Sequence, residues 1–436
     1  MKKVLFVSSE YYPNPSPNGM CIERIMRRCQ ERGYSVIYLG ATFYAELPRC
    51  ENINGIDVYR VRRSFNDRIL RNLRGHSTIF ALLIRWFAIC YKFLRRLLLL
   101  KQWPLEDLVL VRRFLNRILE LHKQYDFDAV LVTYNPLPAM VAVSKFHDKF
   151  KNVPCIYCYL DALSAGNAVQ TNEQRFRLLR FNRIFFKMAK RWEIIFSQCA
   201  KKVIAIEATR SHYNKYFSDS GLLNKMVFLG VPALETKKLL ASDIVPSSLP
   251  YFTPGKKHIL FVGSMYVLRD PTYIIDVAKH IQRDDIEFVF IGLFAEKNKK
   301  ILNVAKEEMP GLFKTYHAIP RVCLEKYMQA AHFFLNIEDN VKSLCASKIF
   351  EYISYGKPVI SNAFSVDDPT VEVLKKYGNS VLLYNSDDVQ QSAEKLNRFI
   401  DRNLCKVVDF NVSKNKFYSS TPDAYVDVLD DIFRAP

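Results

Sequence analysis

The feature that most constrains the fold is a repeated alternation of short apolar runs and longer amphipathic stretches. Near the start, Val4–Ser8 is typical of a buried strand, and after a loop a helical stretch extends to Arg32. Gly33 ends that stretch before a second apolar run at Val36–Leu39. Strand, loop, helix, glycine and strand in this order predict a parallel βαβ unit. The sequence therefore predicts an α/β protein.

The alternation continues through two separate parts of the chain. In the first part, further strands are predicted at Asp57–Val61, Ala129–Thr133, Cys155–Leu160, Val203–Ile206 and Met226–Leu229. In the second part, strands are predicted at His258–Val262, Glu287–Ile291, Phe333–Asn336 and Pro358–Ser361, with helices at Asp270–Ile281 and Ser347–Tyr355. Residues 236–256 between the parts are rich in lysine, proline and serine, which is typical of a linker.

These boundaries predict two doubly wound α/β domains. The chain has 436 residues, of which 49% are hydrophobic, enough for two cores. We predict an N-terminal domain at residues 1–235, a linker at 236–256, a second domain at 257–415, and a C-terminal helix at 416–436 that crosses back to the first domain. Ligands of such sheets bind beyond the carboxyl ends of the strands, so we expect the site in a cleft where the two sheets face each other.

The positive charge of the chain is concentrated in two segments. The formal net charge is +19. Residues 60–123 contain 15 lysines and arginines against 4 acidic residues, and residues 171–202 contain 9 against 2. Almost all of the excess therefore lies in the N-terminal half. A localised excess of this kind suggests an anionic partner, either nucleic acid or phospholipid headgroups.

Both basic segments contain a potential amphipathic helix. Within residues 79–100, Arg85, Lys92 and Arg96 are spaced to share a helix face, with apolar residues around the rest. Residues 180–196 repeat this with a basic stripe (Arg180, Arg183, Lys187, Lys190) and an apolar one (Phe181, Phe185, Met188, Trp192, Ile195). The pattern fits a helix lying on a membrane surface, and equally a crossover helix whose apolar face is core. Two such helices in one domain favour contact with an anionic membrane surface.

The rest of the composition predicts a cytoplasmic protein attached to the inner face of a membrane. Met1–Phe6 has the pattern of a buried strand and not of a signal peptide. Basic residues interrupt every apolar run before the ~20 residues that a membrane span requires. The ten cysteines are scattered, as in reduced cytoplasmic proteins, and the sequence contains no metal-binding cluster.

The strongest local motif runs from Ser347 to Ile360. Its sequence, SKIFEYISYGKPVI, predicts a helix, a glycine stop and a buried strand, with Lys348 and Glu351 one turn apart. From pattern alone the pair could be a surface ion pair. Alternatively, the helix N-terminus could bind a phosphate while Glu351 accepts hydrogen bonds from ribose hydroxyls.

This segment resembles the nucleotide-binding helix of family-four glycosyltransferases with the GT-B fold, especially bacterial polysaccharide and lipopolysaccharide enzymes. The resemblance implies that Ser347 and Lys348 contact the donor phosphates and that Glu351 binds the ribose. The glutamate that contacts the transferred sugar in this family is replaced by Ser343. Glu338 or Asp339 could take its place, and the sequence does not choose between them.

A second matching segment follows the first strand of the second domain. Gly263 and Ser264 end the strand, and the loop carries Arg269 into a helix that opens with Asp270 and Pro271. The family supplies basic residues from this loop to the donor diphosphate. Arg269 matches the later of them, whereas Ser264 stands where the earlier one is expected. An arginine here can hold phosphate bidentately and offset charge on the leaving group, and a solvated loop arginine is the alternative.

Three positions in the first domain are weaker candidates. Gly19 lies where the family has a glycine that lets the backbone approach the donor. Asp161 matches an aspartate that faces the reacting sugar carbon in many members, although it could equally cap a helix. Glu207 is a candidate from its position after a strand alone.

The resemblance implies a retaining hexosyltransferase that uses a nucleotide-diphosphate sugar as donor, needs no cofactor, and extends a glycan, which we expect to be lipid-linked. Asp161 and Arg269 would be the catalytic residues. The alternatives are a nucleic-acid-binding protein, suggested by charge alone, a non-catalytic scaffold of the same fold, and a nucleotide-sugar epimerase. We expect no nucleic acid as partner, because that function leaves Glu351 and the two-sheet layout unexplained.

Overall fold

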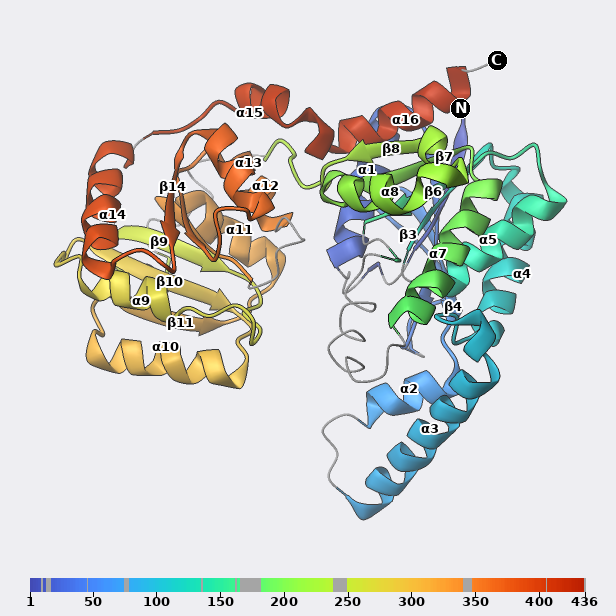
Figure 1. Ribbon diagram of the computed structural model, residues 1–436, viewed down its shortest axis with the longest axis horizontal. Coiled ribbons are helices and arrows are strands. Elements are labelled where there is room, and N and C mark those ends of the chain that lie inside the picture. The colour runs from blue at the N-terminus through green and yellow to red at the C-terminus, as the bar shows by residue number, and fades with distance from the viewer. Residues whose placement is uncertain are drawn as a thin grey trace. The chain divides into compact units, whose positions relative to one another are not determined.

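The structure is a computed structural model that describes residues 1–8, 11–12, 17–44, 46–73, 78–134, 136–160, 163–164, 182–237, 249–339, 347–404 and 406–434. The chain forms two compact units (Figure 1). Unit 1 comprises Met1–Pro232 together with Pro422–Pro436, and unit 2 comprises Ala233–Thr421.

Unit 1 is built on an eight-stranded sheet with the order β3-β4-β2-β1-β5-β6-β7-β8. Its strands are β1 (Lys3–Val7), β2 (Ser35–Thr42), β3 (Cys50–Ile53), β4 (Ile56–Arg62), β5 (Ala129–Thr133), β6 (Cys155–Tyr159), β7 (Lys202–Ile206) and β8 (Met226–Leu229). Only the β3–β4 pair is antiparallel. From β1 the chain adds β2, β3 and β4 on one side of β1. It then adds β5 to β8 on the other side, so the direction of strand addition reverses between β1 and β5.

Both faces of this sheet are covered. In β1, Leu5 and Val7 belong to one core cluster, whereas Val4 and Phe6 belong to the other. The first cluster includes residues of α4 (Leu108–Tyr125), α5 (Leu137–Lys149), α7 (Asn182–Cys199) and α8 (Arg210–Phe217). The second includes residues of α1 (Pro17–Glu31) and α16 (Pro422–Arg434). Two buried faces explain why the strands are continuous apolar runs.

Helix α16 is fixed to α1 by charge as well as by packing. The guanidinium of Arg32 contacts the carboxylates of Asp423 at 2.8 Å, Asp427 at 2.6 Å and Asp430 at 2.8 Å. Arg28 donates to Asp423 as well, at 2.5 Å. This multiple pairing joins the C-terminal end of the chain to the first helix of unit 1.

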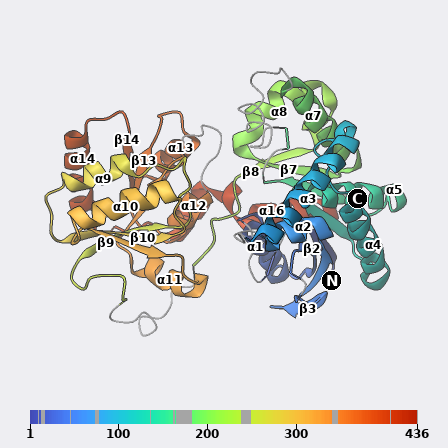
Figure 2. The same ribbon diagram turned by 90° about the horizontal axis from the view of Figure 1, so that it is seen from below.

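Unit 2 has a six-stranded sheet with the order β11-β10-β9-β12-β13-β14, and every pair in it is parallel. Its strands are β9 (Lys257–Val262), β10 (Ile286–Gly292), β11 (Phe313–His317), β12 (Phe333–Ile337), β13 (Val359–Ala363) and β14 (Ser380–Tyr384). Its helices are α9 (Thr272–Lys279), α10 (Glu296–Glu308), α11 (Arg321–Ala330), α12 (Ser347–Ser354), α13 (Pro369–Tyr377), α14 (Val389–Asn403) and α15 (Phe410–Lys416). Helices α9, α10 and α14 supply the core on one face, and α11, α12 and α13 lie on the other (Figure 2). This is the strand order of a doubly wound nucleotide-binding sheet, and the predicted fold class of two parallel α/β units is confirmed.

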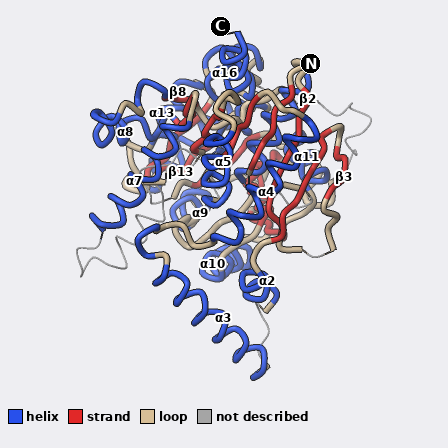
Figure 3. The backbone as a smooth tube through the Cα atoms, turned by 90° about the vertical axis from the view of Figure 1, so that its right-hand side faces the viewer, coloured by secondary structure: helices blue, strands red, loops and turns tan. Residues whose placement is uncertain are grey.

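One helix of unit 1 stands apart from the sheet. Between β4 and β5 the chain forms α2 (Phe65–Asn72), α3 (Ile79–Leu98) and α4, and α3 extends away from the rest of the unit with its N-terminal end at the tip (Figure 3). Its buried positions are the small residues Ala81 and Ala88. Twelve large apolar side chains on it are about half exposed or more: Ile79, Phe80, Leu82, Leu83, Trp86, Phe87, Ile89, Tyr91, Phe93, Leu94, Leu97 and Leu98.

The basic stripe predicted on this helix does not face solvent along its length. Arg85 is exposed, whereas Lys92 turns towards the carboxylates of Asp67 and Glu106, each 3.8 Å away. The side chain of Arg96 lies outside the described residues. The outward surface of α3 is therefore mainly apolar.

The expectation of a second membrane-facing helix is wrong, because the apolar stripe of α7 is packed inside unit 1. Phe185 packs on Trp103 with ring centroids 4.6 Å apart, Trp192 donates its indole N–H to the carbonyl of Gln102, and Phe196 is fully buried. Helix α7 is thus a crossover helix between β6 and β7. Arg180 and Phe181 lie outside the described residues. No helix in the described ranges is long and apolar enough to cross a bilayer.

Candidate functional site

The predicted residues of unit 2 converge at the carboxyl edge of its sheet. Gly263, Ser264 and Arg269 lie on the loop after β9, Glu338 and Asp339 follow β12, and Lys348 and Glu351 lie on α12. In doubly wound sheets ligands bind at this edge.

Gly263 and Lys348 form the centre of the site. Gly263 has φ +109°, and a Cβ built on it would lie 2.5 Å from Nζ of Lys348. A side chain here would displace the ammonium, and the positive φ itself favours glycine. Nζ lies 4.7 Å from the ring centroid of Phe261, and no hydrogen-bond partner for it exists among the described residues. Burial of the ammonium, together with the nearby positive charge of Arg269, lowers the pKa of Lys348 to about 7.

Arg269 is a buried and firmly held side chain, not a solvated loop residue. It is 7% exposed, its Nε donates to Asp339 at 2.8 Å, and its Nη1 donates to the carbonyl of Ser264 at 3.1 Å. The loop itself is held by Asn298 of α10, whose amide donates to the carbonyls of Met265, Tyr266 and Arg269. Burial lowers the pKa of Arg269. Ser264 is exposed.

The pKa values of both acidic residues after β12 are raised. Burial raises the pKa of Glu338 to about 7 and that of Asp339 to about 6. Glu338 accepts from the amide of Asn336, and Asp339 accepts from the hydroxyl of Tyr266 as well as from Arg269. Asp339 therefore serves mainly to position Arg269.

Of the two, Glu338 is the better candidate for contact with a bound sugar. It lines a cavity of about 220 Å³ at the carboxyl edge, together with Val267, Leu268, Asp270, Lys297, Asn362, Phe364 and Asn385. Asp339 does not line it. A carboxylate and two amides offer the mixture of donors and acceptors that sugar hydroxyls require.

Glu351 is 8% exposed and accepts from Arg321, the first residue of α11. Lys237 Nζ lies 3.9 Å from the same oxygen. The carboxylate charge of Glu351 helps to raise the pKa of Arg321. Thus Glu351 belongs to a buried charged cluster and is not a surface partner of Lys348.

Sequence reasoning missed Arg321 and Asn298. One feature of the sequence points to a role for Arg321. A cation in the first turn of a helix opposes the helix dipole, so it is expected to have an acidic partner. No such feature points to Asn298, since its three carbonyl partners come together only in the folded loop. Lys357 of the motif proves to be structural: its ammonium donates to the carbonyls of Met328, Gln329 and Ala331 at the end of α11.

The remaining predicted residues belong to unit 1 or have side chains outside the described residues. Gly19 is buried in the first turn of α1 in unit 1. Glu207 forms an exposed ion pair with Arg210 at 2.5 Å. Asp161 and Ser343 lie outside the described residues, as does the side chain of Ser347, the first residue of α12.

Comparisons with known proteins connect this site to a family. Residues 256–402, which include the loop after β9 and the whole of α12, match the family described as glycosyl transferases group 1. The search of curated proteins found no match.

Solved structures resemble the whole chain at low sequence identity. Sucrose-phosphate synthase from Thermosynechococcus elongatus has a TM-score of 0.57 at 12% identity, covering 100% of this chain and 98% of that one. WaaG, a glycosyltransferase involved in lipopolysaccharide biosynthesis, has a TM-score of 0.51 at 12% identity, with coverage of 98% and 99%. UDP-GlcNAc 2-epimerase from Methanocaldococcus jannaschii has a TM-score of 0.53 at 12% identity, with coverage of 98% and 99%. The chain has the GT-B fold, and its residues 256–402 match the glycosyl transferases group 1 family.

Proposed function

We propose that the protein transfers a sugar from a nucleotide-diphosphate donor to a glycan acceptor. The observation that carries this proposal is the ammonium of Lys348, which is shielded from solvent and has no hydrogen-bond partner in the described structure. A buried cation is costly unless an anion compensates it. A donor diphosphate at the carboxyl edge of the sheet would supply that anion.

The surrounding residues fit the other parts of such a donor. Arg269 would assist Lys348 in offsetting the charge that develops on the leaving diphosphate. Ser264, Ser343 and Ser347 remain proposed donor contacts, as does the backbone at Gly19 and Gly263. Glu351 would bind the ribose and Glu338 the sugar. Asp161 would act on the acceptor side, and we propose hexosyl transfer with retention, as the family resemblance implies.

We further propose that the acceptor is a lipid-linked glycan of surface polysaccharide synthesis and that the protein works at the inner face of the cell membrane. The support is α3, which exposes apolar side chains over most of its surface and contains no acidic residue. Such a surface favours contact with a bilayer, and the absence of acidic residues permits anionic headgroups.

Glu351→Ala is expected to weaken binding of every nucleoside diphosphate and nucleotide sugar, because the variant cannot accept hydrogen bonds from ribose. Loss of a charge-assisted hydrogen bond corresponds to roughly 10-fold or more in affinity. Thermal-shift titration of the wild type with a panel of these ligands identifies the base, and the variant is then compared. The matched control is Glu325→Ala, which removes the other carboxylate bound to Arg321. Wild-type affinity in Glu351→Ala would refute the ribose assignment.

Binding of the donor is also expected to take up a proton above neutral pH. The pKa of Lys348 is lowered to about 7 in the free protein, and an adjacent diphosphate would raise it. Between these two pKa values the free lysine is mostly neutral and the bound lysine is charged, so affinity falls as pH rises above about 7. Calorimetry at mildly alkaline pH in buffers of different ionisation enthalpy measures this uptake. An affinity and a heat that are independent of pH and buffer would contradict it.

A further inference from the structure

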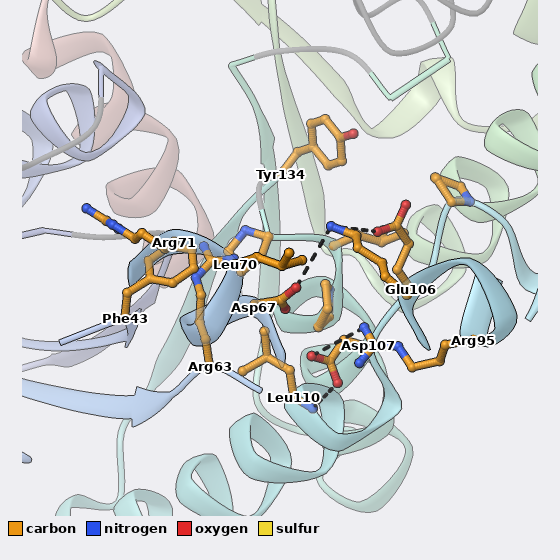
Figure 4. Close-up of a pocket in the computed structure, with 15 residues that line it drawn as sticks. Phe43, Arg63, Asp67, Leu70, Arg71, Arg95, Glu106, Asp107, Leu110 and Tyr134 are labelled. Carbon is orange, nitrogen blue, oxygen red and sulfur yellow. Dashed lines mark hydrogen bonds and ion pairs between the residues drawn. The ribbon is translucent and has the colours of Figure 1, made fainter. Parts of the chain in front are cut away.

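Unit 1 contains a cavity of about 580 Å³ at the foot of α3 (Figure 4). Its walls include Phe43 after β2, Arg63 after β4 and Tyr134 after β5, so it opens at the carboxyl edge of the sheet. This edge is also where the strand order reverses, between β1 and β5. Doubly wound sheets bind their ligands at such a place.

Two basic residues of α3, Lys92 and Arg95, face this cavity, and the carboxylates nearest to them lie beyond hydrogen-bond distance. Nζ of Lys92 is 3.8 Å from both Asp67 and Glu106, beyond hydrogen-bond distance. The nearest carboxylate to Arg95 is Asp107, at 3.7 Å, and its buried Nε has no hydrogen-bond partner among the described residues. Both side chains can therefore bind an anion.

Two further guanidinium groups lie on the other side of the cavity. Those of Arg63 and Arg71 each lie 4.4 Å from the ring centroid of Phe43. Two like charges gathered at one ring repel each other, and an anion between the cavity walls relieves that repulsion. Planar guanidinium groups hold phosphate oxygens bidentately.

The acidic residues of the cavity suit the sugar hydroxyls of a ligand whose phosphate is held by the basic residues. Asp67 and Glu106 flank Lys92, and Tyr134 lines the same cavity (Figure 4). Carboxylates accept hydrogen bonds from sugar hydroxyls. Asp107 is the N-cap of α4, where it accepts from the backbone N–H of Leu110 at 2.9 Å, and Asp67 accepts from the hydroxyl of Ser64 at 2.8 Å.

We propose that this cavity binds the phosphate-bearing head of a lipid-linked acceptor, with the phosphate on Lys92 and Arg95. The inference rests on the proposed function, since it specifies the acceptor. Helix α3 joins the phosphate site to an apolar surface. The part of α3 near its C-terminal end lines the cavity, and its exposed apolar side chains extend from there towards the tip. A lipid carrier lying on the apolar surface of α3 would place its phosphate in the cavity, at Lys92 and Arg95.

The test is calorimetric titration of the full-length protein in mild detergent with a short-chain prenyl phosphate. The prenyl alcohol of the same length measures apolar binding alone, and inorganic phosphate and glucose 6-phosphate represent soluble sources of the phosphate. Arg95→Gln and Lys92→Gln are each expected to weaken the prenyl phosphate about 10-fold or more, without effect on the alcohol. Arg95→Lys should restore part of the loss. The matched control is Arg112→Gln, an exposed arginine of α4 outside the cavity.

The outcomes separate this proposal from the proposed function. If Arg95→Gln and Lys92→Gln, with wild-type melting temperatures, bind the prenyl phosphate as the wild type does, the cavity is not the phosphate site. If Lys348→Met instead loses the prenyl phosphate, the phosphate binds in unit 2 and the proposal is overturned. Equal affinity for glucose 6-phosphate would overturn the lipid source. A wild-type protein that binds the prenyl phosphate but none of the nucleotide sugars would refute the donor assignment alone.

Discussion

Lys348→Met is expected to raise the melting temperature of the free protein and at the same time to abolish binding of nucleoside diphosphates. The lysine ammonium is shielded from solvent next to Gly263 and lacks a hydrogen-bond partner among the described residues. Methionine has similar volume and removes the charge. Replacing buried charges with apolar groups of similar size is often stabilising by roughly 1–4 kcal/mol. Loss of the cation should weaken a diphosphate at least ~100-fold, since it removes both charge and hydrogen bonds.

The pH dependence of this stabilisation follows from the direction of the pKa shift. The pKa of Lys348 is lower in the folded chain, at about 7, than the ordinary value of 10.5. The folded state therefore binds fewer protons between these two values, and the free energy of unfolding contributed by Lys348 rises with pH across that window. The advantage of methionine should accordingly be full at and below about pH 7 and shrink towards pH 10.5. Thermal melting of both proteins across this range measures it.

Lys357→Met is the matched control, because it replaces a second partly buried lysine of unit 2. Burial lowers the pKa of Lys357 to about 8, yet its ammonium donates to backbone carbonyls at the end of α11. Its removal leaves those carbonyls unsatisfied and should lower the melting temperature, since each buried unsatisfied group costs about 1–3 kcal/mol. Lys348→Met would contradict the donor site if it melted lower than the wild type and still bound nucleotides.

The central strands could be predicted from sequence because both faces of each sheet are buried. Burial on both faces requires an uninterrupted apolar run, such as Val4–Val7 in β1 or Ala129–Val132 in β5. The sequence also predicts the edge strand β8 (Met226–Leu229), because its sequence is apolar although it is mostly half-buried. The strands that the sequence did not reveal are β3, β11 and β14, and each lies at a sheet edge. Edge strands alternate or mix exposed and buried residues, as Ser380–Tyr384 does, so they lack that signal.

The candidate site could be predicted only as a set of residue types. The motif identified Lys348 and Glu351, but their spacing also fitted an ion pair between them. In the structure Glu351 pairs with Arg321, some 30 residues earlier, and Lys348 points at Gly263. Arg321 lies on α11 and Gly263 on the loop after β9, so the spacing of residues within the motif cannot predict either contact.

Two amphipathic segments that look alike in sequence have different roles, for a topological reason. Helix α7 is the described helix between β6 and β7, so it must cover the sheet, and its aromatic residues are needed as core. The β4–β5 connection has α2, α3 and α4, and α4 already covers the sheet with Phe114, Ile118 and Leu121. Helix α3 is left with apolar residues that no part of the described structure covers.

Replacing Phe80, Trp86 and Phe87 of α3 together with serine is expected to abolish membrane binding without unfolding the protein. These side chains are 74%, 61% and 67% exposed, so their removal costs little packing. Transfer of each large apolar side chain into hydrocarbon contributes about 1.5–3 kcal/mol. Loss of all three should reduce partitioning into vesicles by about 1,000-fold or more. Flotation with phosphatidylcholine vesicles, with and without an anionic lipid, measures it.

The matched control replaces three exposed valines of unit 2, Val322, Val366 and Val407, with serine. Their exposure of 74%, 62% and 67% is similar, and they lie outside α3. Because the described outward surface of α3 is mainly apolar, wild-type binding should persist on neutral vesicles at high salt, whereas an electrostatic attachment through basic residues would not. A second copy of the chain is the competing occupant of this surface. If the wild type is a dimer in vesicle-free solution and the α3 variant a monomer, the helix serves association and the membrane proposal fails.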